Sequence, residues 1–88
     1  MINDPMTKAG EPLVVDARGH RCPVPTLRLR RAMESVAPGG VIRLLADDPM
    51  ARIDVPHFAA GAGARVLEIS EADGWLQITV ETPAAPAG

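Results

Sequence analysis

The 88-residue chain contains a single cysteine, Cys22, and this thiol is its strongest candidate nucleophile. Cys22 lies in the stretch RGHRCPVP, residues 18–25. Pro23 and Pro25 have a fixed φ and no backbone N–H, so they suit the first turn of a helix. Gly19 gives the chain the freedom to turn out of the apolar run before it. We therefore expect the thiol at a helix N-terminus, where the helix dipole lowers the pKa of a cysteine.

The sequence around Cys22 is strongly basic. Residues 18–31 contain five arginines and no acidic residue, whereas the other four basic residues and all eleven acidic residues lie elsewhere. This asymmetry predicts a positive patch on an acidic body, which would stabilise a thiolate and attract acidic partners. Ordinary solvation of a helix face is an equally good account of two of these side chains, Arg28 and Arg31.

We assign two roles to the residues of this stretch. The residues expected to support the site are Arg18, Gly19, Pro23 and Pro25. The residues expected to dock partners are Arg21, Arg28, Arg30 and Arg31.

No second group in the sequence completes a catalytic apparatus around Cys22. His20 is two residues away, but that spacing in a loop does not guarantee contact, and His57 falls inside a predicted helix. These residues are too few and unsuitably spaced for a closed zinc site, so we expect neither a metal nor a cofactor. A thiol without a base and an oxyanion hole is suited to exchange chemistry, and the natural intermediate of a lone thiol is a persulfide. The alternative is that Cys22 is a small buried side chain with a packing role.

Composition limits the chain to one small domain in a reducing compartment. The only aromatic residues are Phe58 and Trp75, so the core must be aliphatic. A single cysteine excludes an intramolecular disulfide. The first ten residues lack the apolar run of a signal peptide, and no run is long enough to span a membrane. We therefore expect a cytoplasmic location and no membrane partner.

Four strands are predicted from short apolar or alternating runs. The last run alternates most regularly, with Leu76, Ile78 and Val80 on one face. A hairpin turn at residues 71–74 joins it to the run before. The predicted strands are residues 13–15, 41–46, 65–70 and 75–81.

Two helices are predicted between the strands. Apolar residues at three- and four-residue spacing indicate a helix over 26–36, which the breakers at 38–40 end. A second helix is predicted from Pro49, with Asp48 as its cap, to the glycines that follow residue 60. Pro56 lies inside this helix, so we expect a kink or a short first segment.

The order β-α-β-α-β-β predicts a two-layer α/β sandwich. Helical crossovers favour a parallel pair from the first two strands, and the short final turn makes the last two antiparallel. Two helices would cover one face of a four-stranded mixed sheet, and the polar side of the last strand leaves the other face partly open to water. We predict a single domain over residues 13–82 between flexible tails at 1–12 and 83–88.

Three motifs are specific in combination: VDARGHRCPVP at 15–25, Asp-Asp-Pro at 47–49, and DVPHF at 54–58. Together they resemble the TusA/SirA-like family of small sulfur-carrier proteins, and the resemblance covers residues 13–81. It implies the two-layer fold reached above. It also implies that Cys22 accepts sulfane sulfur as a persulfide and donates it within a relay, rather than acting as an autonomous multi-turnover enzyme.

The resemblance also indicates the class of partner. Cysteine desulfurases and rhodanese-like proteins are the donors in this family, and acceptor proteins take the sulfur onward. The basic pair Arg30-Arg31 matches a basic position of the family that helps to dock partners. The family serves tRNA thiolation, molybdenum-cofactor enzymes and sulfur oxidation.

Departures from the family pattern leave the pathway open. Val24 stands where members that act in tRNA thiolation carry glutamate, and His20 stands where the family has an aliphatic residue. Gly63-Ala64 replaces the Gly-His of many members. Whether His20 tunes the thiol is likewise open.

A second class of function stays open beside the sulfur carrier. A regulatory or adaptor module would bind an acidic partner through the arginines and through the open sheet face around Trp75. Direct binding of nucleic acid is not expected, because the chain has an acidic total and only two aromatic residues for stacking.

Overall fold

The computed structural model describes residues 11–21 and 23–83 of the chain, so Cys22 itself lies outside the described residues. Six elements follow one another in the predicted order. They are β1 (Leu13–Asp16), α1 (Val24–Met33), β2 (Val41–Ala46), α2 (Ala51–Gly61), β3 (Arg65–Ala72) and β4 (Trp75–Glu81).

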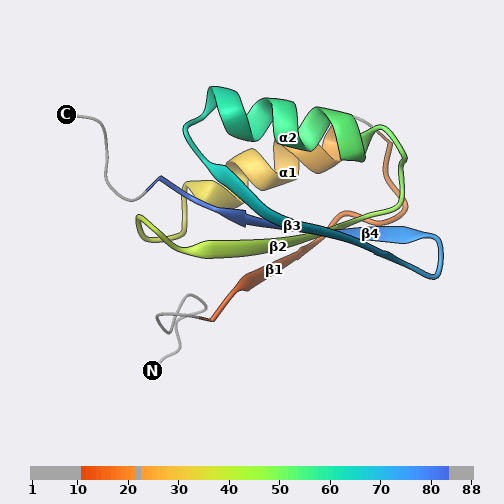
Figure 1. Cartoon of the computed structure of the whole chain (residues 1–88), viewed down its shortest axis with the longest axis horizontal. Coiled ribbons are helices and arrows are strands. Elements are labelled where there is room, and N and C mark those ends of the chain that lie inside the picture. The colour runs from red at the N-terminus through yellow and green to blue at the C-terminus, as the bar shows by residue number, and fades with distance from the viewer. Residues whose placement is uncertain (1–10, 22, 84–88) are drawn as a thin grey trace.

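The four strands form one mixed sheet in the order β1-β2-β4-β3. β1 pairs with β2 in parallel, and β4 lies antiparallel between β2 and β3. Both helices cover the same face of the sheet (Figure 1), because the β1–α1–β2 and β2–α2–β3 connections cross the sheet in the same direction and such crossovers are right-handed. The predicted two-layer fold with a four-stranded mixed sheet is confirmed.

The core lies between the helix layer and the covered face of the sheet. Every second residue of β2 and of β4 is buried, which is the period-2 pattern of a strand with one face on the core. α1 contributes Leu29, and α2 contributes Val55 and Ala59. The buried strand residues of this core are Ile42, Leu44, Ala46, Leu76, Ile78 and Val80.

α1 begins two residues earlier and ends three residues earlier than the predicted 26–36. Its first turn includes Pro25, whose missing N–H is one of the donors that a helix start leaves unpaired anyway. At the other end, the N–H groups of Glu34 and Ser35 bond to carbonyls three residues back, so the last turn tightens and the helix stops. Val36 lies beyond the helix but still packs against the core.

α2 begins at Ala51, two residues after its predicted start. Asp48 contributes to this start, because its carboxylate accepts the N–H of Met50 at 3.0 Å. Pro56 lies within one continuous helix, so the expected short first segment is wrong. Burial of Val55 and Ala59 against the sheet offsets the hydrogen bond that a proline removes from the helix interior.

The β3–β4 hairpin is tighter than predicted. β3 continues to Ala72, so the loop consists of Asp73 and Gly74 rather than of residues 71–74. Both loop residues have positive φ, 53° and 84°, which is the geometry of a type I′ turn. This turn matches the right-handed twist of the two strands.

The assignment of the chain ends to flexible tails stays a prediction. Residues 1–10 and 84–88 lie outside the described residues. Within residues 11–21 and 23–83, neither helix has the length and the apolar character needed to cross a membrane.

Candidate functional site

The loop between β1 and α1 is attached to the end of β2 by three hydrogen bonds. The N–H of Ala17 donates to the carbonyl of Leu45 at 2.8 Å, which extends the parallel pairing beyond β1. The N–H of Gly19 donates to both carboxylate oxygens of Asp47, at 3.0 and 2.9 Å. Gly19 has φ +88°, a conformation that side-chain-bearing residues rarely adopt. The loop that leads to Cys22 is therefore fixed by its backbone.

Arg18 turns away from the loop and packs over the open face of the sheet. Its guanidinium group donates two hydrogen bonds to the carboxylate of Asp16, both at 2.9 Å, and lies 4.9 Å from the ring centroid of Trp75. Hydrogen bonds from the Arg18 side chain, followed by one from its backbone N–H, lower the pKa of Asp16 from 3.8 to about 2. Arg18 is thus held by an ion pair with Asp16 and a cation–π contact with Trp75.

The start of α1 follows Cys22 directly in the sequence. Pro23 is the N-cap residue of α1, and Pro25 is buried in its first turn. The carbonyl of Arg21 accepts the N–H of Val24 at 2.9 Å, so the chain segments before and after Cys22 are held together. The predicted roles of Cys22, Arg18, Gly19, Pro23 and Pro25 stay predictions, because the placement of the thiol is outside the described residues.

Two depressions of similar size are lined by residues that precede or follow Cys22 in the sequence. The first, which we call the polar hollow, has a volume of about 430 Å³ and is lined by Gly19, His20, Arg21, Asp47, Asp48 and Pro49. The second, which we call the helix groove, has a volume of about 410 Å³ and runs between the start of α1 and one side of α2. It is lined by Pro23, Thr26, Asp54, His57, Phe58 and Gly61.

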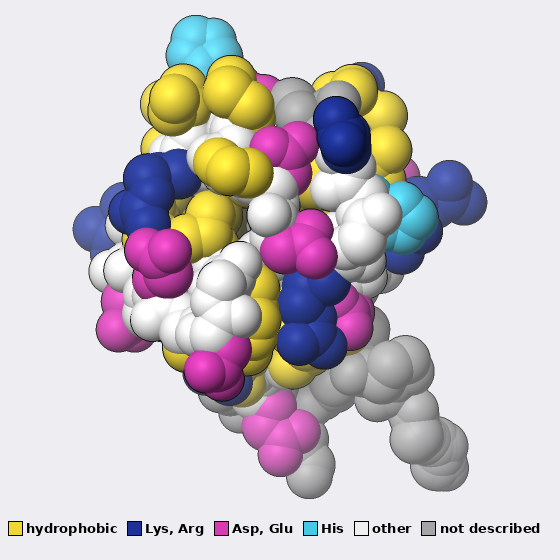
Figure 2. All heavy atoms as spheres, turned by 90° about the vertical axis from the view of Figure 1, so that its right-hand side faces the viewer, with side chains coloured by type: hydrophobic (Ala, Val, Ile, Leu, Met, Phe, Trp, Pro, Cys, Tyr) yellow, Lys and Arg dark blue, Asp and Glu magenta, His cyan; other side chains and the backbone are white. Residues whose placement is uncertain are grey.

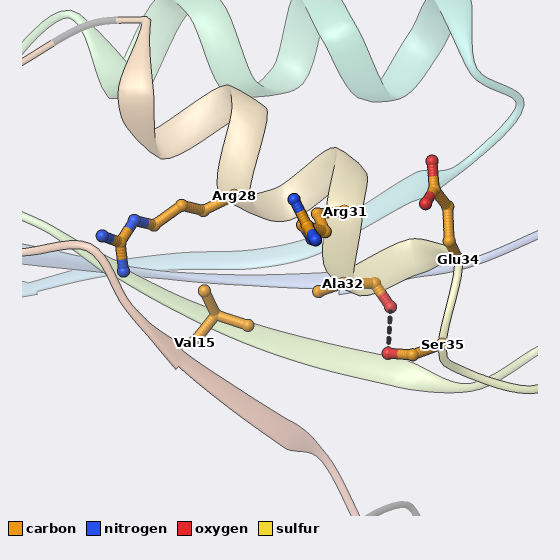
Figure 3. A pocket seen from close by; sticks show the side chains of 6 residues that line it. All are labelled: Val15, Arg28, Arg31, Ala32, Glu34 and Ser35. Atoms are coloured by element: carbon orange, nitrogen blue, oxygen red, sulfur yellow. Dashed lines mark hydrogen bonds between the residues drawn. The ribbon is translucent and has the colours of Figure 1, made fainter.

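A third depression, the arginine hollow, lies between α1 and the edge strand β1. It has a volume of about 670 Å³ and is lined by Val15, Arg28, Arg31, Ala32, Glu34 and Ser35. Arg28 and Arg31 extend over the side of α1 that faces β1, with Val15 below them (Figure 3). Of the predicted docking residues, this hollow brings together Arg28 and Arg31, whereas Arg21 lines the polar hollow and Arg30 lines none of the three.

The surroundings of Arg18 and Arg21, the described arginines that precede α1, are less positive than the sequence indicates. Asp47 and Asp48 line the polar hollow beside Arg21, and Asp16 neutralises Arg18. The sequence predicts a helix cap at Asp48 and gives Asp16 and Asp47 no role beyond their place in the family motifs. A signal for Asp47 was present, since the carboxyl ends of two adjacent parallel strands meet at the same edge of a sheet.

His20 contacts α1 rather than standing free in the loop. A guanidinium nitrogen of Arg28 lies 3.4 Å from Nε2 of His20. His57 is exposed on α2 and lines the helix groove. Among the described residues, no three histidine or carboxylate side chains gather closely enough to hold a metal ion.

Comparison with known proteins gives one consistent result. The family model described as Sulfurtransferase TusA matches residues 13–82. The sulfur carrier protein TusA of Pseudomonas paraeruginosa is 36% identical over 61 residues, which are 69% of this chain and 77% of that protein. A putative sulfur carrier protein of Archaeoglobus fulgidus is 40% identical over 68 residues, 76% of this chain and 88% of that protein.

A solved structure also resembles the chain. The crystal structure of a SirA-like protein from Desulfitobacterium hafniense superposes with a TM-score of 0.72 at 30% sequence identity, covering 80% of this chain and 96% of the other.

Proposed function

The chain belongs to the TusA family of sulfur carriers, and we propose that Cys22 is the residue on which it carries sulfur, as a persulfide. The observation that carries this proposal is the position of the only cysteine. In the sequence, Cys22 directly follows a loop whose backbone is fixed by hydrogen bonds and directly precedes Pro23, the N-cap of α1, and described residues before and after it each line a depression. A cysteine that immediately precedes the N-cap of a helix is expected near the positive end of the helix dipole, which favours its thiolate form.

The proposed reaction is a transfer of sulfane sulfur without net oxidation. The Cys22 thiolate attacks the outer sulfur of a persulfide on the donor protein. A new sulfur–sulfur bond to Cys22 forms, the sulfur–sulfur bond of the donor breaks, and the donor leaves as a thiolate. The proton of the outer sulfur stays on that sulfur, so Cys22 becomes a persulfide. Transfer to an acceptor protein repeats this exchange in the other direction.

Donors of the proposed relay are cysteine desulfurases or rhodanese-like proteins, and the relay takes place in the cytoplasm. A lone thiol that must cycle between thiol and persulfide requires a reducing compartment.

Intact-protein mass spectrometry tests the role of Cys22. After incubation with a cysteine desulfurase and cysteine, the wild-type chain should gain one sulfur atom that a reductant removes. Cys22→Ser should gain none, while its melting temperature stays close to that of the wild type, because an exposed functional thiol contributes little to stability. A large loss of stability would instead identify Cys22 as a buried packing residue.

The adaptor function is the other outcome of this experiment. If several desulfurases and rhodanese-like donors add no sulfur to a thiol that reacts readily with alkylating reagents, Cys22 is not a carrier residue. Biological activity that survives Cys22→Ser would then point to the arginines as the working surface.

The arginine hollow is the proposed docking site for an acidic surface of the partner. Arg28 and Arg31 present two guanidinium groups around an apolar floor of Val15 and Ala32, which suits a carboxylate on an apolar stem. Charge reversal of both arginines should slow transfer several-fold at low salt and flatten its dependence on salt. Arg65→Glu is the matched control, since Arg65 lies on β3 and pairs with Glu81.

A further inference from the structure

The open face of the sheet, which points away from the helices, is not covered by any described element. Both helices lie on the opposite side (Figure 1). Alternation along the strands places Val41 and Leu45 of β2 and Trp75 of β4 on the open face, because their neighbours in the chain are buried in the core. All three side chains are partly exposed. The open face therefore presents apolar surface on which an ion pair would be partly shielded from water.

One row of side chains crosses the middle of the open face. It consists of residues in register on the four strands, and we call it the central row. From β1 to β3 its members are Val14, Arg43, Thr79 and Glu68. Residues that lie opposite one another in a sheet point to the same face, so all four side chains belong to the open face. Neighbouring strands are about 4.8 Å apart, which separates Arg43 from Glu68 by about 10 Å with Thr79 midway.

Neither charge of the central row has a partner among the described residues. Glu68 is exposed and takes part in no ion pair or hydrogen bond there. Arg43 is partly exposed, and its buried Nε atom also lacks a hydrogen bond within the described chain. The terminal nitrogens of its guanidinium group are not buried, so a carboxylate from outside the chain can reach the charge. Such a carboxylate would compensate for the hydration that Arg43 loses on the sheet.

The other arginines that lie on or over the open face are already paired. Arg18 pairs with Asp16 at 2.9 Å, and Arg65 pairs with Glu81 at 3.1 Å. Figure 2 shows charged side chains of both signs over the sheet at the end of the molecule where the β3–β4 hairpin lies. The charges left for recognition on the open face of the described strands are those of the central row.

The central row is complementary to itself. A twofold axis that runs along β4, midway between two facing sheets, sets β4 of one copy over β4 of the other and exchanges the places of β2 and β3. Arg43 of each copy then lies over Glu68 of the other, so two ion pairs form together. The two Thr79 residues meet at the axis, where their hydroxyl groups can donate and accept hydrogen bonds. Facing sheets pack about 10 Å apart, a gap that an arginine and a glutamate span between them.

We propose that the open face binds a second copy of this chain through reciprocal pairs of Arg43 with Glu68. The overlap comprises β2, β4 and β3 of each copy, and it covers Val41, Leu45 and Trp75. Three strands span only about 14 Å, so the interface is small and the dimer is reversible. The helix layers of both copies point outward. The inference does not depend on the proposed function, because it uses no residue of the stretch around Cys22.

Sedimentation equilibrium at low salt tests this dimer. The mass of the wild-type chain should rise from one copy towards two between about 10 μM and about 1 mM. Arg43→Glu and Glu68→Arg should each raise the dissociation constant about tenfold or more, since each places like charges over one another. An equimolar mixture of the two variants should dimerise again, because every facing pair then joins opposite charges. Arg52→Glu is the matched control, because Arg52 lies on α2 in the helix layer, away from the open face.

Three results of this experiment would overturn the inference. One is a wild-type chain that stays monomeric at about 1 mM. Another is a mixture that is no more dimeric than either variant alone, because the two charges would then serve a different partner, such as an acidic segment of another protein. The third is an equal weakening by Arg52→Glu, which would make net charge rather than the central row the cause. Recovery of the dimer in the mixture supports both the interface and its twofold symmetry.

Trp75 reports where the two copies meet. It is the only tryptophan, and it lies on the open face of β4. Its emission should move to longer wavelength as the wild-type chain is diluted through the same concentration range, because dissociation returns the indole ring to water. An emission that stays constant while the mass falls to one copy would place the dimer on another surface and overturn the inference.

Discussion

The two sides of the Cys22 position differ in how their polar groups are satisfied. On the side of the polar hollow, the loop is tied down by backbone hydrogen bonds to Asp47 and by the pair of Arg18 with Asp16. On the side of the helix groove, the lining is largely apolar and the hydroxyl of Thr26 has no partner among the described residues. The polar groups of the first side are satisfied within the chain, whereas the second side leaves a buried oxygen without a hydrogen bond among the described residues.

Gly19, beside the polar hollow, and Gly61, which lines the helix groove, should respond to replacement by alanine in opposite ways. Gly19→Ala should destabilise the chain by about 1–2 kcal/mol, because alanine is strained at φ +88°. Among the substitutions that compare the polar hollow with the helix groove, this one should change the stability most. Urea unfolding measures it, and sulfur loading should slow as the loop loses its bond to Asp47. An unchanged stability would mean that the loop does not depend on this conformation.

Thr26→Val should stabilise the free chain by about 1 kcal/mol, because it removes a buried oxygen that lacks a hydrogen bond. Thermal unfolding of the purified variant gives the value. Thr26→Ser provides the comparison, since it keeps the oxygen and loses a methyl group. A loss of stability in Thr26→Val would show that the hydroxyl is already satisfied in the free chain.

Gly61→Ala should stabilise the chain by about 0.5–1 kcal/mol. Gly61 is helical, and a methyl group there has open space around it, so alanine reduces the entropy of the unfolded chain without a clash. The same urea experiment as for Gly19→Ala measures the gain. A destabilised Gly61→Ala would contradict the open wall of the groove.

The smallest expected effect concerns the pair of Asp16 and Arg18. The pKa of Asp16 is lowered from 3.8 to about 2 by hydrogen bonds from Arg18, so the pair stabilises the fold above pH 3.8 and is lost as the pH falls through about 2. Trp75 is the only tryptophan and lies beside Arg18, so its fluorescence reports the pair. Asp16→Asn should shift the Trp75 emission already at neutral pH. Identical emission spectra for Asp16→Asn and the wild type would contradict the ion pair between Asp16 and Arg18.

Spacing along the chain was sufficient to predict the fold. Period-2 burial in β2 and β4 and the three- and four-residue spacing in α1 report directly on which side of each element meets the core. The ends of elements were predicted less well. α1 stops before Val36 because its last turn tightens, and α2 continues through Pro56 because burial of Val55 outweighs the missing hydrogen bond.

The sequence by itself determined the order of the elements, the covered face of the sheet and the single cysteine that we propose as the carrier of sulfur. These properties depend on local periodicity, on the prolines around Cys22 and on its being the only cysteine. Only the tertiary structure brought Asp47 to Gly19, Trp75 to Arg18 and α2 alongside the start of α1. Those contacts join residues far apart in the chain, and their side chains carry no periodic signal that would pair them.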